Sequence, residues 1–328
     1  MDTFKSFIPE IYEVNDQSFH RIALAVFRYQ AENNPLYRRY LHELKVNPET
    51  VSGLEDIPFT PISFFKTHDI QSDVWAPEAI FKSSGTTGSV QSRHLVASES
   101  DYLHNTKRCF EHFFDSLTSY HFLALLPSYL EREGSSLISM IRFFIDQSKS
   151  DHSGFYLRDH DRLRKQLELL RKGNRKVILW GVSFALLDLV EEGSLDLSGC
   201  LVFETGGMKG RRREITRQEL HSVLTSGFNV TQIYSEYGMT ELFSQAYTIG
   251  GHHFRCPPQM KVIGRDPSDP MFKGLVNETC GLNVIDLANW RTISFIETED
   301  LGRVLPDGSF EVQGRMDNSE IRGCNLLL

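Results

Sequence analysis

The sequence is poor in cysteine and contains neither a long apolar run nor a long basic run. No apolar stretch reaches about 18 residues, and the N-terminus becomes polar within a few residues, so we expect neither a membrane span nor a signal peptide. Acidic residues outnumber basic residues by 43 to 35, which gives a net charge of −8. Because no basic run is long enough to follow a phosphate backbone, nucleic acid is not expected as the main partner.

The cysteines are odd in number and widely spaced, at Cys109, Cys200, Cys256, Cys280 and Cys324. This arrangement favours reduced thiols and a cytoplasmic location over a disulfide framework. The sequence also shows no internal repeat and no low-complexity linker. Its 328 residues, of which 40% are hydrophobic and 24% charged, are typical of a soluble protein with one large α/β domain or two smaller ones.

The most informative segment is FKSSGTTGSVQSR, which runs from Phe81 to Arg93. Hydroxyl side chains and glycines make up its centre: Ser83, Ser84, Gly85, Thr86, Thr87 and Gly88. Such residues form poor helices and poor strands, but their backbone N–H and side-chain O–H groups suit an anion, above all phosphate. The segment is not a Walker loop, since no Lys-Ser or Lys-Thr follows the glycines. A solvated Ser/Gly linker is the alternative interpretation.

Two later segments favour the phosphate interpretation. Residues 232–241 read QIYSEYGMTE, and residues 298–303 read TEDLGR, followed by Gly314-Arg315-Met316-Asp317. Together with SSGTTG they resemble, in order, the three signature motifs of the adenylate-forming superfamily. That superfamily includes acyl-CoA ligases, peptide-synthetase adenylation domains and luciferases. Three matches in the right order are far more specific than any one of them.

The resemblance implies that the protein activates a carboxylic acid as its acyl-adenylate, with ATP and Mg²⁺ as cofactors. In this reaction a carboxylate attacks the α-phosphorus of ATP and expels pyrophosphate, so the protein must hold two anions together and neutralise phosphate charge. The implied nucleotide-binding residues are the six of SSGTTG together with Gly206, Gly207, Met208, Glu236, Tyr237, Gly238, Met239, Thr240, Asp300 and Arg315. The implied catalytic residues are Thr240, Glu241, Arg315 and Cys324.

Each implied role fits the chemistry of its side chain. Thr240 would donate to the α-phosphate, and Glu241 would hold the Mg²⁺ that bridges phosphates. Tyr237 offers an aromatic face to adenine. Asp300 would accept hydrogen bonds from the ribose hydroxyls, while Arg315 would help to hold ribose and phosphate. Two structural alternatives remain open: Thr240-Glu241 also suits the start of a helix, and Asp300 also suits a turn.

The chain departs from the superfamily pattern in two places. Thr-Glu-Asp stands where the family usually has Thr-Gly-Asp, and the side chain of Glu299 makes the expected turn less permissive. The phosphate loop also lacks the family's Pro-Lys, and Arg93 is a candidate for the missing positive charge.

The C-terminal segment indicates which family within the superfamily the sequence resembles. After Asp317 the sequence continues only to Leu328, where most superfamily members continue into a lid domain. This ending, with LPSYLER at 126–132 and ETGGMKG at 204–210, resembles the LuxE-type acyl-protein synthetases, the synthetase component of the fatty-acid reductase of bacterial bioluminescence. The resemblance implies that Cys324 carries the acyl group, that no lid domain is present, and that a reductase or acyltransferase partner accepts the acyl group. An inert cysteine in the tail is the alternative.

The spacing of apolar residues predicts an α/β fold in which a mostly parallel sheet is covered by helices on both faces. Helices are expected within residues 1–45 and at 135–145, 159–171, 183–191 and 214–224, and strands at 121–126, 176–180, 200–203 and 230–234. In such sheets, ligands bind beyond the C-terminal ends of the strands. Short strands at 283–286, 292–296, 303–305 and 309–313, with Asp307-Gly308 as a hairpin turn, predict a small β subdomain.

We therefore expect three parts: residues 1–75 as a helical segment packed on the core, 76–275 as the α/β adenylating core, and 276–328 as the small β subdomain with a truncated hinge tail. The pair His252-His253 near Cys256 lacks zinc-site spacing, so a loop near the ligand is expected there. The apolar run at 137–145 either lines an acyl tunnel or is buried core.

The leading hypothesis is an acyl-protein synthetase that loads a carboxylic acid, expected to be a fatty acid, onto Cys324. The second is a ligase that transfers an acyl or aryl group to CoA or to a carrier protein, of the phenylacetate-CoA ligase type, in which Cys324 has no role. The third is a non-catalytic nucleotide-binding subunit that regulates a partner.

Overall fold

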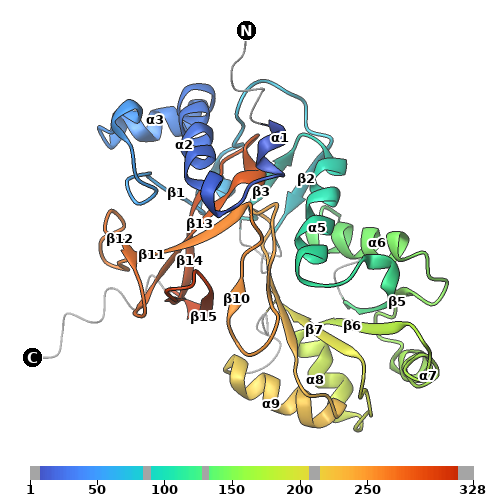
Figure 1. The fold of residues 1–328 in the computed structure, drawn as a ribbon. Coiled ribbons are helices and arrows are strands. Elements are labelled where there is room, and N and C mark those ends of the chain that lie inside the picture. Colours follow the sequence, from blue (N-terminus) through green and yellow to red (C-terminus); the bar gives the residue numbers. More distant parts are fainter. Residues whose placement is uncertain (1–7, 84–89, 128–132, 207–214, 317–328) are drawn as a thin grey trace, which may run out of the picture. The chain divides into compact units, whose positions relative to one another are not determined.

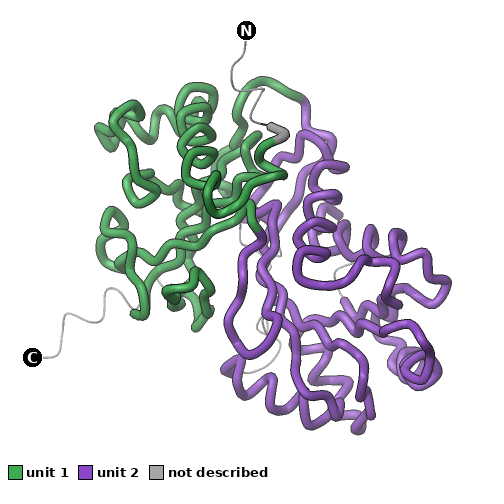
Figure 2. The backbone as a smooth tube through the Cα atoms, in the orientation of Figure 1, with its two compact units in different colours: residues 1–75, 258–328 green, residues 76–257 purple. Residues whose placement is uncertain are grey.

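The structure is a computed structural model that describes residues 8–83, 90–127, 133–206 and 215–316. The chain forms two compact units (Figure 2), of which unit 1 comprises residues 1–75 and 258–328 and unit 2 comprises residues 76–257. The units divide the chain after residues 75 and 257, where the sequence predicted divisions after 75 and 275. They also group the N-terminal segment with the C-terminal segment.

Unit 2 contains a mostly parallel sheet with helices on both faces (Figure 1). Its helices are α5 (Glu99–Phe113), α6 (Ser136–Ser148), α7 (His160–Leu170), α8 (Ser183–Glu191) and α9 (Arg217–Phe228), with a short 3₁₀ helix at Leu117–Ser119. Its strands are β2 (Ala79–Lys82), β3 (Arg93–Val96), β4 (Tyr120–Leu125), β5 (Gly154–Phe155), β6 (Lys176–Val182), β7 (Leu201–Thr205), β8 (Tyr234–Tyr237), β9 (Ala246–Thr248) and β10 (Phe254–Arg255).

The strands of this sheet follow the order β5-β4-β6-β7-β8-β9-β10. The first five run parallel, whereas β9 is antiparallel to β8 and β10 is antiparallel to β9. Strands β2 and β3 form a separate antiparallel hairpin. Helices α5 and α6 lie on one face of the sheet and α7, α8 and α9 on the other (Figure 1). This is the arrangement that right-handed crossovers between parallel strands produce.

The core on the α5–α6 face is a cluster of fully buried aromatic side chains. The ring of Phe110 on α5 lies 6.3 Å from Trp180 of β6, 6.0 Å from Phe203 of β7 and 5.3 Å from Phe144 of α6, measured between ring centroids. Large aromatic side chains dominate the energy of a core because each removes so much apolar surface from water. Since Phe144 belongs to the apolar run at 137–145, the structure favours buried core over an acyl tunnel for this run.

Unit 1 combines an antiparallel sheet with N-terminal helices. Its helices are α1 (Ile8–Ile11), α2 (Asp16–Asn33), α3 (Pro35–Glu43) and α4 (Phe64–Thr67), with 3₁₀ helices at Pro48–Thr50 and Leu287–Asn289. Its strands are β1 (Thr60–Pro61), β11 (Met260–Arg265), β12 (Lys273–Leu275), β13 (Thr279–Asp286), β14 (Phe295–Val304) and β15 (Phe310–Arg315). Strands β12-β11-β13-β14-β15 are antiparallel neighbours, and β1 pairs in parallel with β14.

Local sequence sets the limits of the first long helix. The side chain of Asn15 accepts hydrogen bonds from the first turn of α2, and Ser18 completes a capping box. Pro35 cannot continue α2 but suits the first position of α3, so the chain turns between Asn33 and Pro35.

Buried amides attach these helices to the C-terminal part of unit 1. Gln30 of α2 donates to the carbonyl oxygen of Trp290 at 3.0 Å and accepts from the N–H of Ser294 at 3.0 Å. Asn34, at the junction of α2 and α3, donates to the carbonyl oxygen of Thr292 at 2.8 Å. These bonds satisfy loop groups that would otherwise be buried without partners, which explains why the N-terminal segment belongs to unit 1.

The predicted α/β class is confirmed, and most predicted elements lie where expected. Two predictions were wrong in their limits. The strand expected at 230–234 begins only at Tyr234 and continues to Tyr237, so Glu236 and Tyr237 lie within β8 and not after it. The strands expected at 292–296 and 303–305 are parts of one long strand, β14, so the turn expected at Thr298-Glu299-Asp300 between them is absent.

Candidate active site

The hairpin β2–β3 holds the base of the predicted phosphate loop. The N–H of Ser83 donates to the carbonyl oxygen of Ser92 at 3.1 Å, and the N–H of Ser92 donates back to the hydroxyl of Ser83 at 2.9 Å. Gln91 adds a third bond, from its amide nitrogen to the carbonyl oxygen of Ser83 at 2.9 Å. The Ser83 hydroxyl thus closes the loop as an acceptor, and its own proton can be donated elsewhere.

The predicted residues Thr240 and Glu241 lie in a turn that follows β8. The N–H of Leu242 donates to the carbonyl oxygen of Met239 at 3.1 Å, which closes this turn. No helix begins at Thr240, so the helix-start alternative is wrong for this part of the described chain. Glu241 is buried, with 6% of its surface exposed. The turn therefore presents a carboxylate together with the Thr240 hydroxyl.

A buried histidine connects the loop base with this turn. His94 of β3 contacts the carbonyl oxygen of Thr240 through Nδ1 at 2.7 Å. Burial lowers the pKa of His94 to about 4, although the Thr240 carbonyl opposes this shift, so the ring is neutral near pH 7. A carbonyl oxygen accepts only, and Nδ1 must therefore carry the ring proton and donate it.

The segment after the turn is also fixed from helix α5. The side-chain amide of Asn105 donates to the carbonyl oxygen of Phe243 at 2.9 Å and to the hydroxyl of Ser244 at 3.1 Å. The ring of Phe243 lies 5.2 Å from the ring of His94, measured between centroids. The turn thus has partners on a strand and on a helix of unit 2.

Glu236 lies on the α5 face at the end of β8. It is buried, and the hydroxyl of Thr205 on the neighbouring strand β7 donates to its Oε2. A β-carbon added at Gly238 would lie 2.2 Å from Glu236 Oε1, so only glycine leaves room for this carboxylate. Glu236 therefore packs closely against Gly238 at the start of the turn.

Gly206 directly follows the neighbouring strand β7. Its φ of +69° lies in the left-handed region, which glycine adopts without strain. Its carbonyl oxygen lies 2.8 Å from the hydroxyl of Ser183, which begins α8 and also lies 3.0 Å from Glu204 Oε2. Gly206, Glu236 and Tyr237 thus lie at the carboxyl ends of two adjacent parallel strands, the usual position of a ligand site in such sheets.

Glu204 anchors a buried polar network on the α8–α9 face. Its Oε1 lies 3.5 Å from His221 Nε2 and 3.6 Å from Arg217 Nε. Burial raises the pKa of Glu204, but the hydrogen bond from His221 and the charge of Arg217 outweigh burial and hold the pKa below its ordinary value. The Arg217 guanidinium lies 4.4 Å from the ring centroid of Phe254, which is 5.6 Å from the Tyr237 ring. The network thus reaches the predicted adenine-binding tyrosine.

The third motif lies in unit 1. Asp300 of β14 pairs across the ladder with Arg315 of β15, and Asp300 Oδ1 lies 3.4 Å from Arg315 Nε. The N–H of Asp300 donates to the hydroxyl of Thr298 at 3.1 Å. Asp300 is buried, whereas the Arg315 side chain is largely exposed. The structure thus brings these two predicted residues together on adjacent strands.

The predicted site residues that the structure describes therefore form two groups, one in each unit. Unit 2 holds Ser83, Gly206, Glu236, Tyr237, Gly238, Met239, Thr240 and Glu241, and unit 1 holds Asp300 and Arg315. Ser84, Gly85, Thr86, Thr87, Gly88, Gly207, Met208 and Cys324 lie outside the described residues. Among the residues that are described, no three His, Cys, Asp or Glu side chains form a group that could hold a metal ion.

Sequence reasoning did not select His94, Ser183 or Glu204. Two of them had a visible signal: Glu204 is a charged residue within an apolar strand, and Ser183 directly follows the buried strand β6. Charged side chains are rarely buried unless they have partners, so Glu204 was a candidate on that ground. His94 had no such signal, because a histidine in a short strand is unremarkable.

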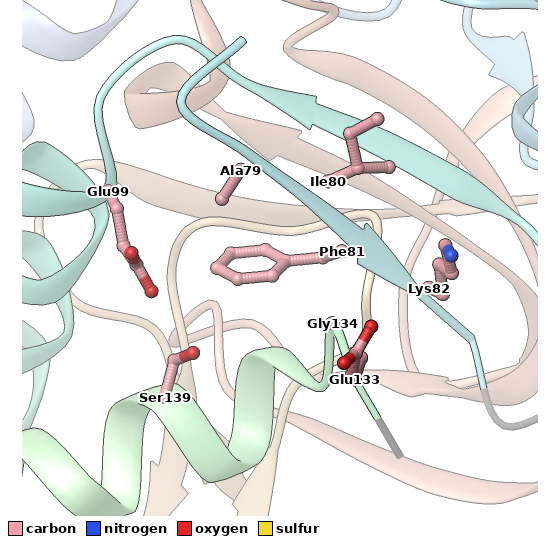
Figure 3. A pocket seen from close by; sticks show the side chains of 8 residues that line it. All are labelled: Ala79, Ile80, Phe81, Lys82, Glu99, Glu133, Gly134 and Ser139. Carbon is pink, nitrogen blue, oxygen red and sulfur yellow. The ribbon is translucent and has the colours of Figure 1, made fainter.

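A pocket of about 310 Å³ lies beside β2 (Figure 3). Its lining residues are Ala79, Ile80, Phe81, Lys82, Glu99, Glu133, Gly134 and Ser139. The carbonyl oxygen of Gly134 accepts the N–H of Lys82 at 2.8 Å, on the edge of β2 that faces away from β3. The charges around this pocket are of both signs, and no predicted site residue that the structure describes lines it.

Within the described ranges, no helix has both the length and the apolar character needed to cross a bilayer.

Solved structures share this fold. ATP-bound MatB from Rhodopseudomonas palustris matches with a TM-score of 0.54 and 16% identity, over 74% of this chain and 49% of that chain. A 2-hydroxyisobutyryl-CoA ligase in complex with 2-HIB-AMP and CoA matches with a TM-score of 0.70 and 14% identity, over 92% of this chain and 68% of that chain. The chain has the fold of the adenylate-forming ligases.

A luciferase-like enzyme from the nonluminescent mealworm Zophobas morio matches with a TM-score of 0.50 and 16% identity, over 83% of this chain and 61% of that chain. The matched region covers about half the length of MatB and about two thirds of the length of the 2-hydroxyisobutyryl-CoA ligase. At these identities the likeness is one of fold. No protein-family model matches the sequence, and none of the curated proteins does.

Proposed function

We propose that the protein activates a carboxylic acid with ATP as an acyl-adenylate and then transfers the acyl group to a thiol. The observation that carries this proposal is the hydrogen bond between His94 and Thr240, which joins the base of the phosphate loop to the Thr240–Glu241 turn. The two motifs together supply hydroxyls, N–H groups and a carboxylate, which are the groups that a triphosphate and Mg²⁺ require. The fold that this chain shares with ATP-bound MatB supports the same proposal.

In the proposed first step, a carboxylate oxygen of the acid attacks the α-phosphorus of ATP, and the bond from that phosphorus to pyrophosphate breaks. The SSGTTG groups would bind the β- and γ-phosphates, and Thr240 would donate to the α-phosphate, where negative charge accumulates. Glu241 would hold Mg²⁺, because this ion commonly binds one or two carboxylates together with substrate phosphates.

The roles proposed for the nucleoside are those that the motif resemblance implies for each residue. Tyr237 would offer its ring to adenine, and Gly206 would let the backbone approach the ring closely. Asp300 would accept hydrogen bonds from the ribose hydroxyls, and Arg315, its partner on the adjacent strand, would orient the carboxylate and contact ribose or phosphate.

In the proposed second step, a thiolate attacks the acyl carbon, the acyl–oxygen bond breaks, and AMP leaves. We propose Cys324 as the thiol and a reductase or acyltransferase as the partner that accepts the acyl group, on the resemblance to acyl-protein synthetases. The alternative is a ligase that uses CoA, which the likeness to 2-hydroxyisobutyryl-CoA ligase over 92% of this chain favours. A fatty acid is the proposed substrate in the first case.

Exchange of labelled pyrophosphate into ATP, over a panel of carboxylic acids, tests the first step. We expect acid-dependent exchange that requires Mg²⁺ and is abolished in Glu241→Gln, which conserves volume and removes only the anion. Glu43→Gln, an exposed glutamate on α3, is the matched control and should exchange like the wild type. Absence of exchange with every acid would favour the non-catalytic nucleotide-binding subunit.

The second step has its own test. Cys324→Ser should retain exchange, which precedes acyl transfer, but should lose the covalent acyl group that intact-mass measurement detects on the wild-type protein. An acyl group that persists in this variant, or thioester formation only after CoA is added, would replace the acyl-protein synthetase with the CoA ligase.

A further inference from the structure

We infer that His94 is a positioning residue for the adenylation step, which fixes the base of the Ser83–Ser92 loop against the Thr240–Glu241 turn. The inference rests on the proposed function, because it assigns a role within the same site. It concerns a residue that belongs to none of the three motifs and lies 146 positions from its partner in the sequence.

Strand pairing and hydrogen bonds hold the loop side of this connection in place. His94 pairs with Phe81 in the β2–β3 ladder, and Arg93 pairs with Lys82 at the end of the ladder. The bonds between Ser83 and Ser92 close the loop immediately beyond this last pair. On its other edge, β2 is held by the bond from the Lys82 N–H to Gly134 (Figure 3). The position of His94 therefore fixes where both ends of the loop emerge.

The turn side is held at the residue that matters most for the proposed chemistry. The acceptor is the backbone carbonyl of Thr240, whose hydroxyl is the proposed α-phosphate donor and whose neighbour Glu241 is the proposed Mg²⁺ ligand. A bond to this carbonyl sets the peptide plane between the two residues. It thereby sets how both side chains are presented relative to the loop.

The chemistry of the bond explains why a histidine suits this position. His94 is fully buried, so its ring remains uncharged and donates as a neutral imidazole. The ring also packs against Phe243 at 5.2 Å, so it contributes apolar contact as well as a hydrogen bond. A displacement of about 1 Å between reacting groups can cost about 100-fold in rate, so the connection matters for catalysis even though His94 need not touch the substrate.

Two substitutions separate these contributions. His94→Asn retains an N–H donor at the position of Nδ1 but removes the rest of the ring, whereas His94→Phe retains a ring but removes the donor. We expect His94→Phe to lose 10-fold or more of the exchange rate at saturating ATP and acid, and His94→Asn to stay within about threefold of the wild type. His94→Met, which fills space flexibly without a donor, should behave like His94→Phe and provides the result if the phenylalanine variant does not fold.

The outcomes are distinct. Wild-type protein that catalyses no exchange would overturn the proposed function itself. Wild-type exchange that is unchanged in His94→Phe and His94→Met would overturn the positioning role of His94. The same conclusion would follow if His94→Asn lost as much activity as His94→Phe, because the retained donor would then have made no difference to the exchange rate. Thermal unfolding of each variant, measured in parallel, must show a folded protein.

Discussion

Acidification should destabilise this protein through His94. Burial is the main cause that lowers the pKa of His94 from its ordinary 6.5 to about 4 in the folded chain, and the Thr240 carbonyl only partly opposes it. Between these two values the unfolded chain binds a proton that the folded chain excludes. The free energy of unfolding must therefore rise with pH through this window and fall as the pH falls through it.

The size of the effect follows from the two pKa values. One pKa unit corresponds to about 1.4 kcal/mol, so the folded state should lose about 3 kcal/mol through His94 by the time the pH reaches about 4. This is a large share of the stability of an ordinary domain, which is about 5–15 kcal/mol. Urea unfolding of the wild type and of His94→Asn, from near neutral pH down to about pH 4, measures it directly.

The comparison with His94→Asn is essential because other groups titrate in the same range. The variant loses the ring contacts at every pH, and this loss lowers its free energy of unfolding by the same amount throughout. The variant also lacks the titrating imidazole, so its free energy of unfolding depends less steeply on pH than that of the wild type. The difference in unfolding free energy between the two proteins should therefore shrink by about 3 kcal/mol towards acid pH. Parallel curves, or an NMR signal of the His94 ring that titrates near its ordinary pKa, would refute the reasoning.

Two further predictions concern stability. Gly134→Ala places a β-carbon 2.7 Å from the carbonyl oxygen of Ile80 at a φ of +79°, and it should lower the free energy of unfolding by about 1–3 kcal/mol. Gly154→Ala, which meets nothing within 4 Å, is its control and should stay within about 0.5 kcal/mol of the wild type. Glu204→Gln removes the buried anion beside His221 and Arg217 and should lower the free energy of unfolding by about 2–3 kcal/mol near neutral pH. This is less than the usual cost of breaking a buried ion pair, because Arg217 is partly exposed. Since the pKa of Glu204 is lowered, this contribution is present above the ordinary carboxyl pKa of 4.5 and is lost as the pH falls, so urea unfolding should show the two proteins converging in acid.

Apolar periodicity predicted the elements whose stability depends on burial alone. Helix α8 begins at Ser183 and ends at Glu191 as expected, and β6 follows its predicted apolar run. In these segments the apolar pattern and the burial coincide, because both faces of the sheet are covered. The sequence is therefore sufficient wherever hydrophobic side chains fill the core.

The prediction was wrong where polar side chains are buried. Strand β8 comprises Tyr234, Ser235, Glu236 and Tyr237, which do not form an apolar run. Ser235 is buried because it contacts His221 at 3.1 Å, and Glu236 because Thr205 donates to it. Those partners come from α9 and β7, so the sequence around β8 could not reveal them.

The same reason accounts for the missing turn at Thr298-Glu299-Asp300. Burial alternates along β14, with Thr298 and Asp300 inside, and this alternation is typical of a strand. A buried aspartate in a strand is favourable only with a cationic or donor partner, which here is Arg315 on the adjacent strand. The local sequence shows the charged residue Asp300 but not Arg315, its partner on the adjacent strand. Without that partner, a charged residue at this position suggests an exposed turn.

Motif resemblance finds the groups that would touch a ligand, and it does not find the groups that hold those residues in place. Thr240 and Glu241 stand out because phosphate and Mg²⁺ need a hydroxyl and a carboxylate, whichever protein supplies them. The side chain that holds these two residues in place needs only an N–H donor at the right position in space. Many residue types can supply such a donor from many positions in the sequence. His94 supplies it from the strand that also closes the predicted phosphate loop, so a single hydrogen bond relates two motifs that the sequence separates. Activity should therefore depend on His94 through its donor, and this dependence can be read only from the fold.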